Sequence, residues 1–225
     1  MQTESGSFEA SSSSGQVTGI LVKPENPDSL LVLAHGAGAG IHHPWMNTVS
    51  AKLAAQGIAT FRYQFPYMEQ GRKTPGPPAI AMATVRSAVA EAGRLAPGIP
   101  LFAGGKSYGG RMTSSAEAKE HLEGLEGIVF FGFPLHAPGR PSNDRAEHLY
   151  QVGLPMLFLQ GTRDSLADLE YLRPVVSRIG GKASLEIIEG GDHSFRVPKK
   201  QNKGEEEVLE GLAASVKKWL LKILA

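Results

Sequence analysis

The sequence contains no cysteine, no long apolar run and no large excess of charge of one sign. Without cysteine the chain has no disulfide framework, no thiolate metal site and no Cys nucleophile, which fits a reducing compartment. No apolar run approaches the roughly 18 residues that a membrane-spanning helix needs. The formal net charge is +1, and the lysines at 199, 200 and 203 form too short a cluster for a nucleic-acid surface. These absences favour a cytoplasmic protein that binds neither nucleic acid nor membrane.

The length and the N-terminal composition predict one folded domain behind a tail. A chain of 225 residues can bury one sizeable core, and a second independent domain is not expected. Residues 1–15 are rich in serine and lack the basic and apolar regions of a signal peptide. We therefore expect a disordered tail over 1–15 and a single domain over 16–225.

Short apolar segments typical of buried strands alternate with helical patterns throughout this domain. The strand segments are 17–22, 30–34, 59–63, 100–104, 127–131, 155–159 and 183–188. The helical segments are 45–56, 79–95, 108–121 and 166–179, followed by an apolar stripe from 208 to 223 that we expect to dock on the sheet. This alternation indicates βαβ units, so we predict an α/β fold whose mainly parallel sheet carries helices on both faces.

The segment after the strand at 100–104 has the pattern Gly-x-Ser-x-Gly, centred on Ser107. In a nucleophile elbow this pattern places the serine on a tight turn between strand and helix, above the sheet. A plain glycine-rich turn is the alternative. A phosphate-binding P-loop is disfavoured because Pro100 stands where that loop needs its first glycine.

Glycines at 36, 38 and 40 follow the strand at 30–34. They could form a simple tight turn, or they could let the backbone N–H groups of Ala37 and Tyr108 hold a developing oxyanion. A dinucleotide-binding fingerprint is disfavoured because Ile41 stands at its last glycine position.

Asp164 follows the strand at 155–159 and is the candidate acid of a catalytic triad. A carboxylate there would lie beside the elbow at the carboxyl edge of the sheet. The same residue could instead cap the next helix, and Asp168 is a nearby rival within that helix.

His193 follows the last strand segment and is the candidate general base. It is the only one of the seven histidines that lies after Asp164, as the order Ser, Asp, His requires. The neighbouring Asp192 is expected to shape the turn. His42 and His43 lack a third ligand, so no metal site is predicted.

With these four loops in chain order, the sequence resembles the α/β-hydrolases over about residues 17–225. Its compact layout is similar to the small dienelactone-hydrolase-like branch, which also includes subunits of chromatin-modifying complexes. The resemblance implies a single-domain α/β-hydrolase fold. Dienelactone hydrolases carry Cys at the elbow, and Ser107 in its place favours an ordinary serine esterase. The stretch 135–153 is too short for a large lid and is expected to form a partial cover with His136 and Tyr150.

We therefore predict a carboxylesterase-type serine hydrolase that cleaves small esters through an acyl-enzyme. Ser107 is the nucleophile, His193 the general base and Asp164 the acid that orients it, with no cofactor or metal. The alternatives are a non-catalytic scaffold or binding protein on the same fold, or an acyltransferase or perhydrolase with the same triad. The sequence indicates neither the physiological substrate nor the oligomeric state.

Four apolar residues that follow strand ends are candidates for the substrate pocket: Phe65, Tyr67, Met68 and Phe133. A place in the core is an equally good interpretation of each.

Overall fold

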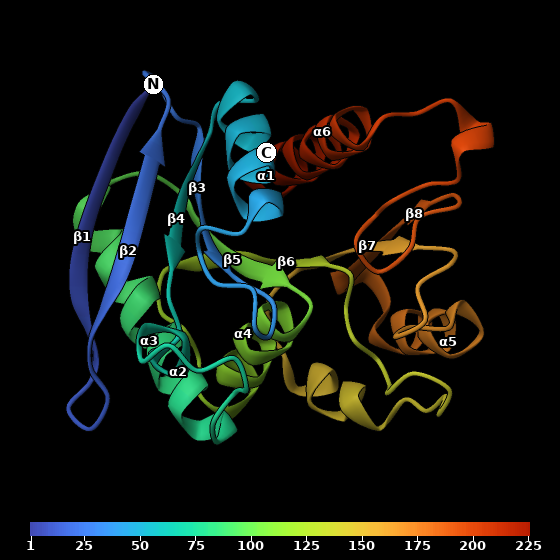
Figure 1. The fold of residues 1–225 in the computed structure, drawn as a ribbon, viewed down its shortest axis with the longest axis horizontal. Helices are drawn as coiled ribbons and strands as arrows, with labels where there is room; N and C mark the ends of the chain where they lie inside the picture. Colours follow the sequence, from blue (N-terminus) through green and yellow to red (C-terminus); the bar gives the residue numbers. More distant parts are fainter.

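An eight-stranded sheet in the order β1-β2-β4-β3-β5-β6-β7-β8 runs through the computed structural model, which describes residues 1–225 (Figure 1). The strands are β1 (Gln2–Ser11), β2 (Gly15–Lys23), β3 (Ser29–Ala34), β4 (Ile58–Tyr63), β5 (Leu101–Lys106), β6 (Leu125–Phe131), β7 (Met156–Gly161) and β8 (Ala183–Ile188). β2 is antiparallel to both of its neighbours, whereas all pairs from β4 to β8 across the sheet are parallel. The carboxyl ends of β3 to β8 therefore share one edge.

Helices cover both faces of the sheet, as predicted. In Figure 1, α1 (Pro44–Ala55) and α6 (Glu205–Leu224) lie above it. Below it lie α3 (Pro78–Leu95), α4 (Tyr108–Lys119) and α5 (Leu169–Ile179). The connections add the short helix α2 (Pro66–Glu69) and three 3₁₀ turns, η1 (Asp144–Gln151), η2 (Gly180–Lys182) and η3 (Lys199–Gln201). The predicted α/β class with a mainly parallel sheet is confirmed.

The alternation of side chains along β3 shows why its sequence is apolar throughout. Leu31 and Leu33 belong to the hydrophobic cluster beneath α1 and α6, whereas Leu30, Val32 and Ala34 belong to the cluster over α3 and α4. Successive residues of a strand point to opposite faces, so a strand covered on both faces buries every side chain. The stripe of the C-terminal helix docks as expected, with Val208, Leu212, Val216 and Trp219 buried.

The prediction of a disordered tail over 1–15 is wrong, because residues 2–11 form β1. Its hydrogen-bonded register with β2 runs from Gln2 opposite Lys23 to Ser11 opposite Gly15. Phe8 is buried, with its ring centroid 5.7 Å from that of Phe61. Only one face of β1 is buried, and only near its C-terminal end, so apolar side chains are needed there at alternate positions. The serine-rich composition of the segment conceals this short pattern.

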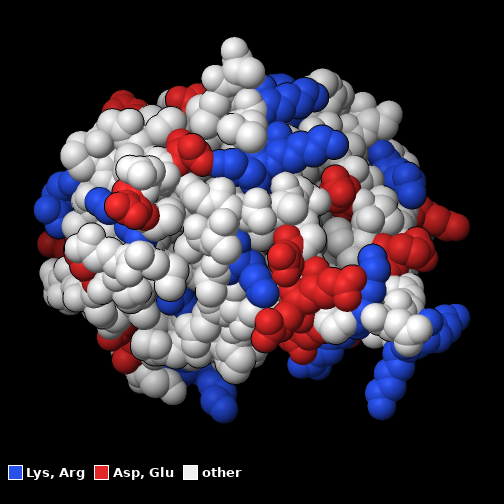
Figure 2. Space-filling model, turned by 90° about the horizontal axis from the view of Figure 1, so that it is seen from above, with Lys and Arg blue, Asp and Glu red and all other residues white.

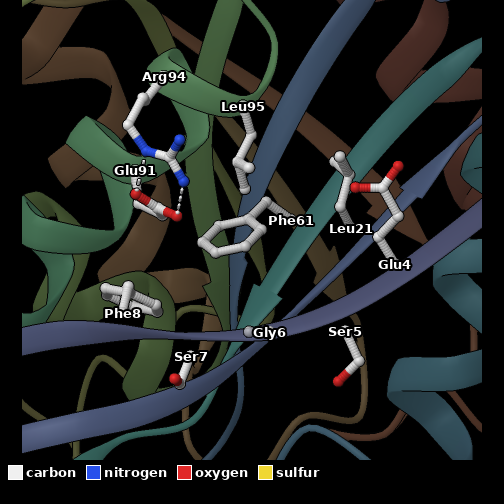
Figure 3. Close-up of a pocket in the computed structure, with 11 residues that line it drawn as sticks. Glu4, Ser5, Gly6, Ser7, Phe8, Leu21, Phe61, Glu91, Arg94 and Leu95 are labelled. Atoms are coloured by element: carbon white, nitrogen blue, oxygen red, sulfur yellow. Dashed lines mark hydrogen bonds and ion pairs between the residues drawn. The ribbon is translucent and has the colours of Figure 1, made fainter.

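β1 and α3 enclose a shallow hollow of about 160 Å³ on this side of the sheet (Figure 3). The ring of Phe61 lies at its centre, with Phe8 beside it and the ion pair of Glu91 with Arg94 at the rim. The hollow contains no histidine and lies under the antiparallel end of the sheet. It therefore lacks the imidazole that the predicted site needs.

The stretch 135–153 packs into the core and forms no lid domain. Ala146, Leu149 and Val152 join the cluster formed by β6, β7 and α5. His136 is buried and accepts a hydrogen bond from the N–H of Asp168, 2.9 Å away. The absence of a large lid agrees with the predicted fold. His136 supports the start of α5 through its bond to Asp168.

The charge distribution agrees with the near-neutral sequence. On the face shown in Figure 2, basic and acidic side chains are interspersed among uncharged residues. No helix combines the length and the apolar character needed to cross a membrane.

Candidate active site

Ser107 lies between the end of β5 and the start of α4, in a backbone conformation that L-residues rarely adopt. Its φ is 52° and its ψ is −115°. Such a strained conformation persists only where the surrounding structure enforces it, and it occurs mostly at functional sites. The turn carries the side chain to the carboxyl edge of the sheet, as a nucleophile elbow requires.

The glycines two residues before and after Ser107 allow this turn to pack against β3. A Cβ atom at Gly105 would lie 2.4 Å from the carbonyl oxygen of Ala34, and one at Gly109 would lie 2.6 Å from the same oxygen. Real Cβ atoms do not approach backbone this closely. The Gly-x-Ser-x-Gly pattern is therefore a steric requirement of the fold at this point.

The imidazole of His193 lies between Ser107 and Asp164. Its Nε2 is 2.8 Å from Ser107 Oγ, and its Nδ1 is 2.7 Å from Asp164 Oδ2. An ionised carboxylate can only accept, so Nδ1–H donates to Asp164 and Nε2 is free to accept the proton of the serine hydroxyl. The three side chains predicted to form a triad thus come together from loops after β5, β7 and β8.

Asp164 is held by several donors besides His193. Gln160 Nε2 donates to its Oδ2 at 2.6 Å, and the N–H of Leu166 donates to its Oδ1 at 2.8 Å. Burial raises the pKa of this carboxyl, but the hydrogen bond and charge of His193, the N–H of Leu166 and the charge of Lys106 together outweigh it and lower the pKa. Asp164 also caps the turn after β7, while Asp168 is only the N-cap of α5.

The loops after β7 and β8 are joined to each other, and this fixes His193 beside Asp164. The N–H of Arg163 donates to the carbonyl of Gly191 at 2.8 Å, and the N–H of Gly190 donates to Thr162 Oγ1 at 2.8 Å. Asp192 shapes the turn as expected, since its Oδ1 accepts from the N–H groups of residues 194 and 196.

The loop after β3 lies against the elbow, and the backbone N–H of Ala37 in this loop has no protein acceptor. A Cβ atom at Gly36 would lie 4.0 Å from the Cβ of Ser107. The N–H groups of Ala37 and Tyr108 donate to no protein acceptor. Tyr108 opens α4, where unpaired N–H groups and the helix dipole favour an anion. These two groups can hold an oxyanion beside Ser107.

Buried side chains support this loop from below. His35 Nε2 accepts from the N–H of Phe65 at 3.1 Å and its Nδ1–H donates to the carbonyl of Gly36 at 2.8 Å, which makes the ring neutral. Burial lowers the pKa of His35 to about 4, although the hydrogen bond to Gly36 opposes the shift. The hydroxyl of Tyr67 accepts from the N–H of Gly38 at 3.2 Å.

An open cavity of about 490 Å³ borders Ser107 and His193. Its apolar wall is formed by Ala37, Ala39, Pro44, Trp45, Met46 and Leu166. Its polar wall includes His43, Lys106, Ser194, Arg196 and Glu205. A space of this volume accommodates a small organic molecule beside the nucleophile.

The four predicted pocket residues do not line this cavity. Phe65 and Tyr67 lie in the core beneath the loop after β3, and Met68 packs against the same cluster. Phe133 is buried with Phe130 under η1. Each follows a strand end, but its side chain points to the inner face of its loop, so the core interpretation is the one that the structure supports.

Apart from Ala37, the wall of the cavity comes from residues that sequence reasoning missed. Trp45 is the second residue of α1, and Arg196 follows the predicted histidine by three residues. Gln160 and Lys106 were also missed, although they flank predicted motifs. Their position next to a motif is the only sign of Gln160 and Lys106 in the sequence, because their contacts are made with distant segments of the chain. No group of three or more His, Asp or Glu side chains is placed to hold a metal ion.

Comparison with known proteins agrees with this architecture. The alpha/beta hydrolase domain family matches residues 27–221. A dienelactone hydrolase from Anabaena variabilis superposes with a TM-score of 0.76, with 18% identity and 99% of each chain covered. A serine hydrolase without lid from Xanthomonas campestris superposes with a TM-score of 0.74, with 18% identity, 97% of this chain and 96% of that chain covered. At this identity the two structures show a shared fold.

A curated relative in Mycobacterium tuberculosis is 28% identical over 187 residues, which is 81% of this chain. Its name proposes a phosphoribosyl transferase. The matched segment is 40% of that protein, so the chain spans about two fifths of the length of its curated relative.

Proposed function

The chain belongs to the α/β-hydrolase family, and from this membership we propose that it is a carboxylesterase-type serine hydrolase acting on small esters. The observation that carries the proposal is the position of the His193 ring, 2.8 Å from Ser107 Oγ and 2.7 Å from Asp164 Oδ2. An imidazole in this position can take the serine proton while the carboxylate stabilises the imidazolium.

In the proposed reaction, His193 removes the hydroxyl proton as Ser107 Oγ attacks the ester carbonyl. The negative charge that develops on the carbonyl oxygen is held by the N–H groups of Ala37 and Tyr108, and each such donor is typically worth about 3 kcal/mol. The tetrahedral intermediate collapses, His193 gives its proton to the departing alcohol, and the acyl group stays on Ser107. Water activated by His193 then releases the acid and restores the serine.

The cavity supports a small ester as the substrate. It is about 490 Å³ in volume, open to solvent, and walled on one side by apolar residues of α1 and the loop after β3. A lipid-sized acyl chain would extend beyond it. We therefore expect the highest kcat/KM with short or aromatic acyl groups in a series of p-nitrophenyl esters.

A Ser107→Ala variant tests the proposal directly. We expect wild type to be labelled by a fluorophosphonate probe and to hydrolyse p-nitrophenyl acetate, and the variant to lose labelling and about four to six orders of magnitude in kcat, as seen when a triad serine is removed. Ser114→Ala is the matched control, because Ser114 Oγ also contacts a histidine ring, 2.8 Å from His148 Nε2, but lies buried within α4.

Two other functions remain distinct outcomes of that experiment. Folded wild type that is neither labelled nor active would indicate a scaffold or binding protein on the same fold. Labelling combined with preferential acyl transfer to added alcohols or to hydrogen peroxide would indicate an acyltransferase or perhydrolase. The transferase named for the M. tuberculosis relative does not carry over to this chain, which spans only two fifths of that protein.

The proposed partners follow from the same site. A small ester is the expected ligand, with no cofactor and no nucleic acid or membrane partner. A cytoplasmic location is part of the proposal and rests on the absence of cysteine.

A further inference from the structure

Lys106, the residue before the proposed nucleophile, reaches the loop that carries His193. Its Nζ donates a hydrogen bond to the backbone carbonyl of His193. The same ammonium lies 5.8 Å from the centroid of the Trp45 ring and 5.4 Å from that of Phe195. Cation–π contacts at these distances favour the charged amine. One side chain thus connects the elbow, the start of α1 and the turn after β8.

The ammonium of Lys106 also lies close to the side chains of Asp164 and His193. A Cβ atom at Gly132 would lie 3.2 Å from Lys106 Nζ, 3.5 Å from Asp164 Oδ2 and 3.5 Å from His193 Cε1. These three groups therefore surround a single point at the end of β6. The proximity is a feature of the tertiary structure, since Lys106 ends β5 while Asp164 and His193 lie in the loops after β7 and β8.

A merely space-filling role does not explain a charged side chain here. Burial disfavours an ammonium and lowers the pKa of Lys106 to about 8, although the charges of Asp164 and Asp192 oppose this shift. An apolar side chain of the same length would fill the space without that cost. The amine is therefore retained at an energetic disadvantage, beside the reacting groups.

We propose that Lys106 is a positioning residue of the triad, which ties the His193 loop to the elbow and whose positive charge opposes protonation of the imidazole. The inference rests on the proposed serine-hydrolase function. By holding the His193 carbonyl, Lys106 keeps Nε2 directed at Ser107 Oγ. By its charge, it balances Asp164, which otherwise favours the imidazolium.

The charged neighbours of Lys106 set the expected pH dependence. Asp164 faces it from the loop after β7, and Asp192 and His193 face it from the loop after β8. From α1 the facing group is the uncharged Trp45, and His43, Arg196 and Glu205 line the same cavity. As pH rises through about 8, the amine loses its charge and its attraction to both carboxylates. The neutral amine still donates an N–H to the His193 carbonyl, but this bond is no longer charge-assisted and holds the loop more weakly, so kcat should decline.

The test compares full pH profiles of wild type, Lys106→Met and Lys106→Arg with p-nitrophenyl acetate. We expect wild type to show a decline in kcat near pH 8. Lys106→Met should lower kcat at pH 7 at least about 10-fold, with KM changed less than about 3-fold. It should also abolish the alkaline decline and move the acid limb of the pH profile to higher pH. Lys106→Arg keeps its charge at all these pH values, so it should restore part of kcat and leave the acid limb in place.

Three results would overturn the inference while leaving the esterase proposal intact. These are a Lys106→Met pH profile with the same shape as that of wild type, a Lys106→Met variant whose kcat at pH 7 equals that of wild type, or a wild-type kcat that stays level from pH 7 to 10. The pH profile of wild-type kcat needs no variant, so it tests the inference even where the substitutions impair folding. Failure of the esterase proposal is distinguishable, because wild type itself would then neither react with a fluorophosphonate nor turn over an ester.

Discussion

Gly109 shows how closely the backbone at the elbow is constrained. It lies in the first turn of α4, and a Cβ atom there would come within 2.6 Å of the carbonyl oxygens of both Ala34 and His35. Because those atoms belong to β3 and to the loop that follows it, they cannot shift without moving Ala37, the proposed oxyanion donor. The lack of space at Gly109 thus makes the geometry of the site depend on how closely α4 packs against β3.

A Gly109→Ala substitution should therefore destabilise the protein by about 3 kcal/mol or more, at the upper end of the range for overpacked sites. It should also lower esterase activity in the fraction that folds. Urea unfolding followed by circular dichroism measures the first effect. Gly93→Ala in α3 is the matched control, because a Cβ atom there meets nothing within 4 Å. This control should gain about 0.5–1 kcal/mol from helix propensity. Equal effects of the two substitutions would contradict the steric argument.

The convergence of Ser107, Asp164 and His193 was predictable because each follows its own strand, in an order that one fold demands. Gln160 and Lys106 were not predictable in the same way. The amide of Gln160 joins the N–H of Phe133 to Asp164, and Lys106 reaches the carbonyl of His193. The contact of Gln160 with Phe133 and that of Lys106 with His193 join segments that are distant in the sequence, and no local pattern encodes them.

The strand β1 is the element that the sequence concealed. Its outer residues are exposed and polar, and only Phe8 and Ala10 are buried. Ala10 also accepts a hydrogen bond from Ser87 Oγ of α3 through its carbonyl, 2.9 Å away. The strand therefore covers one end of α3 as well as pairing with β2.

Replacing Phe8 by Ala should reveal this packing. The ring is 7% exposed and contacts Phe61 and Tyr63, so the substitution should cost about 3 kcal/mol of unfolding free energy. Glu4→Ala, on the exposed part of the same strand, should change the stability by less than about 0.5 kcal/mol. Thermal or urea unfolding distinguishes the two. A Phe8→Ala protein as stable as wild type would mean that residues 1–15 are a disordered tail after all.

The stability of the whole molecule should depend on pH through buried histidines. Burial lowers the pKa of His35 to about 4 from 6.5. Burial, followed by the charge of Arg111, likewise lowers that of His148 to about 4. Between pH 6.5 and 4 the unfolded chain binds protons that the folded protein cannot, so the stability falls as pH falls through this window. Above pH 6.5 the contribution is fully present.

We expect His35 alone to account for a loss on the order of 3 kcal/mol between pH 7 and 4. Urea unfolding at several pH values gives the slope of stability against pH. His35→Gln should flatten that slope, whatever its effect on the stability at pH 7. Identical slopes in wild type and His35→Gln would exclude this origin of acid sensitivity.

Periodicity and the residues after each strand were enough to predict the α/β class, the sheet edge and the candidate Ser107, Asp164 and His193. Such signals are local, because burial on both faces imposes a continuous apolar run and an elbow imposes its glycines. The wall of the cavity, the contact of Lys106 with the His193 carbonyl and the strand β1 were decided only in the tertiary structure. Each depends on which face of a loop or strand meets a distant segment, and that choice minimises the free energy of the whole packed chain.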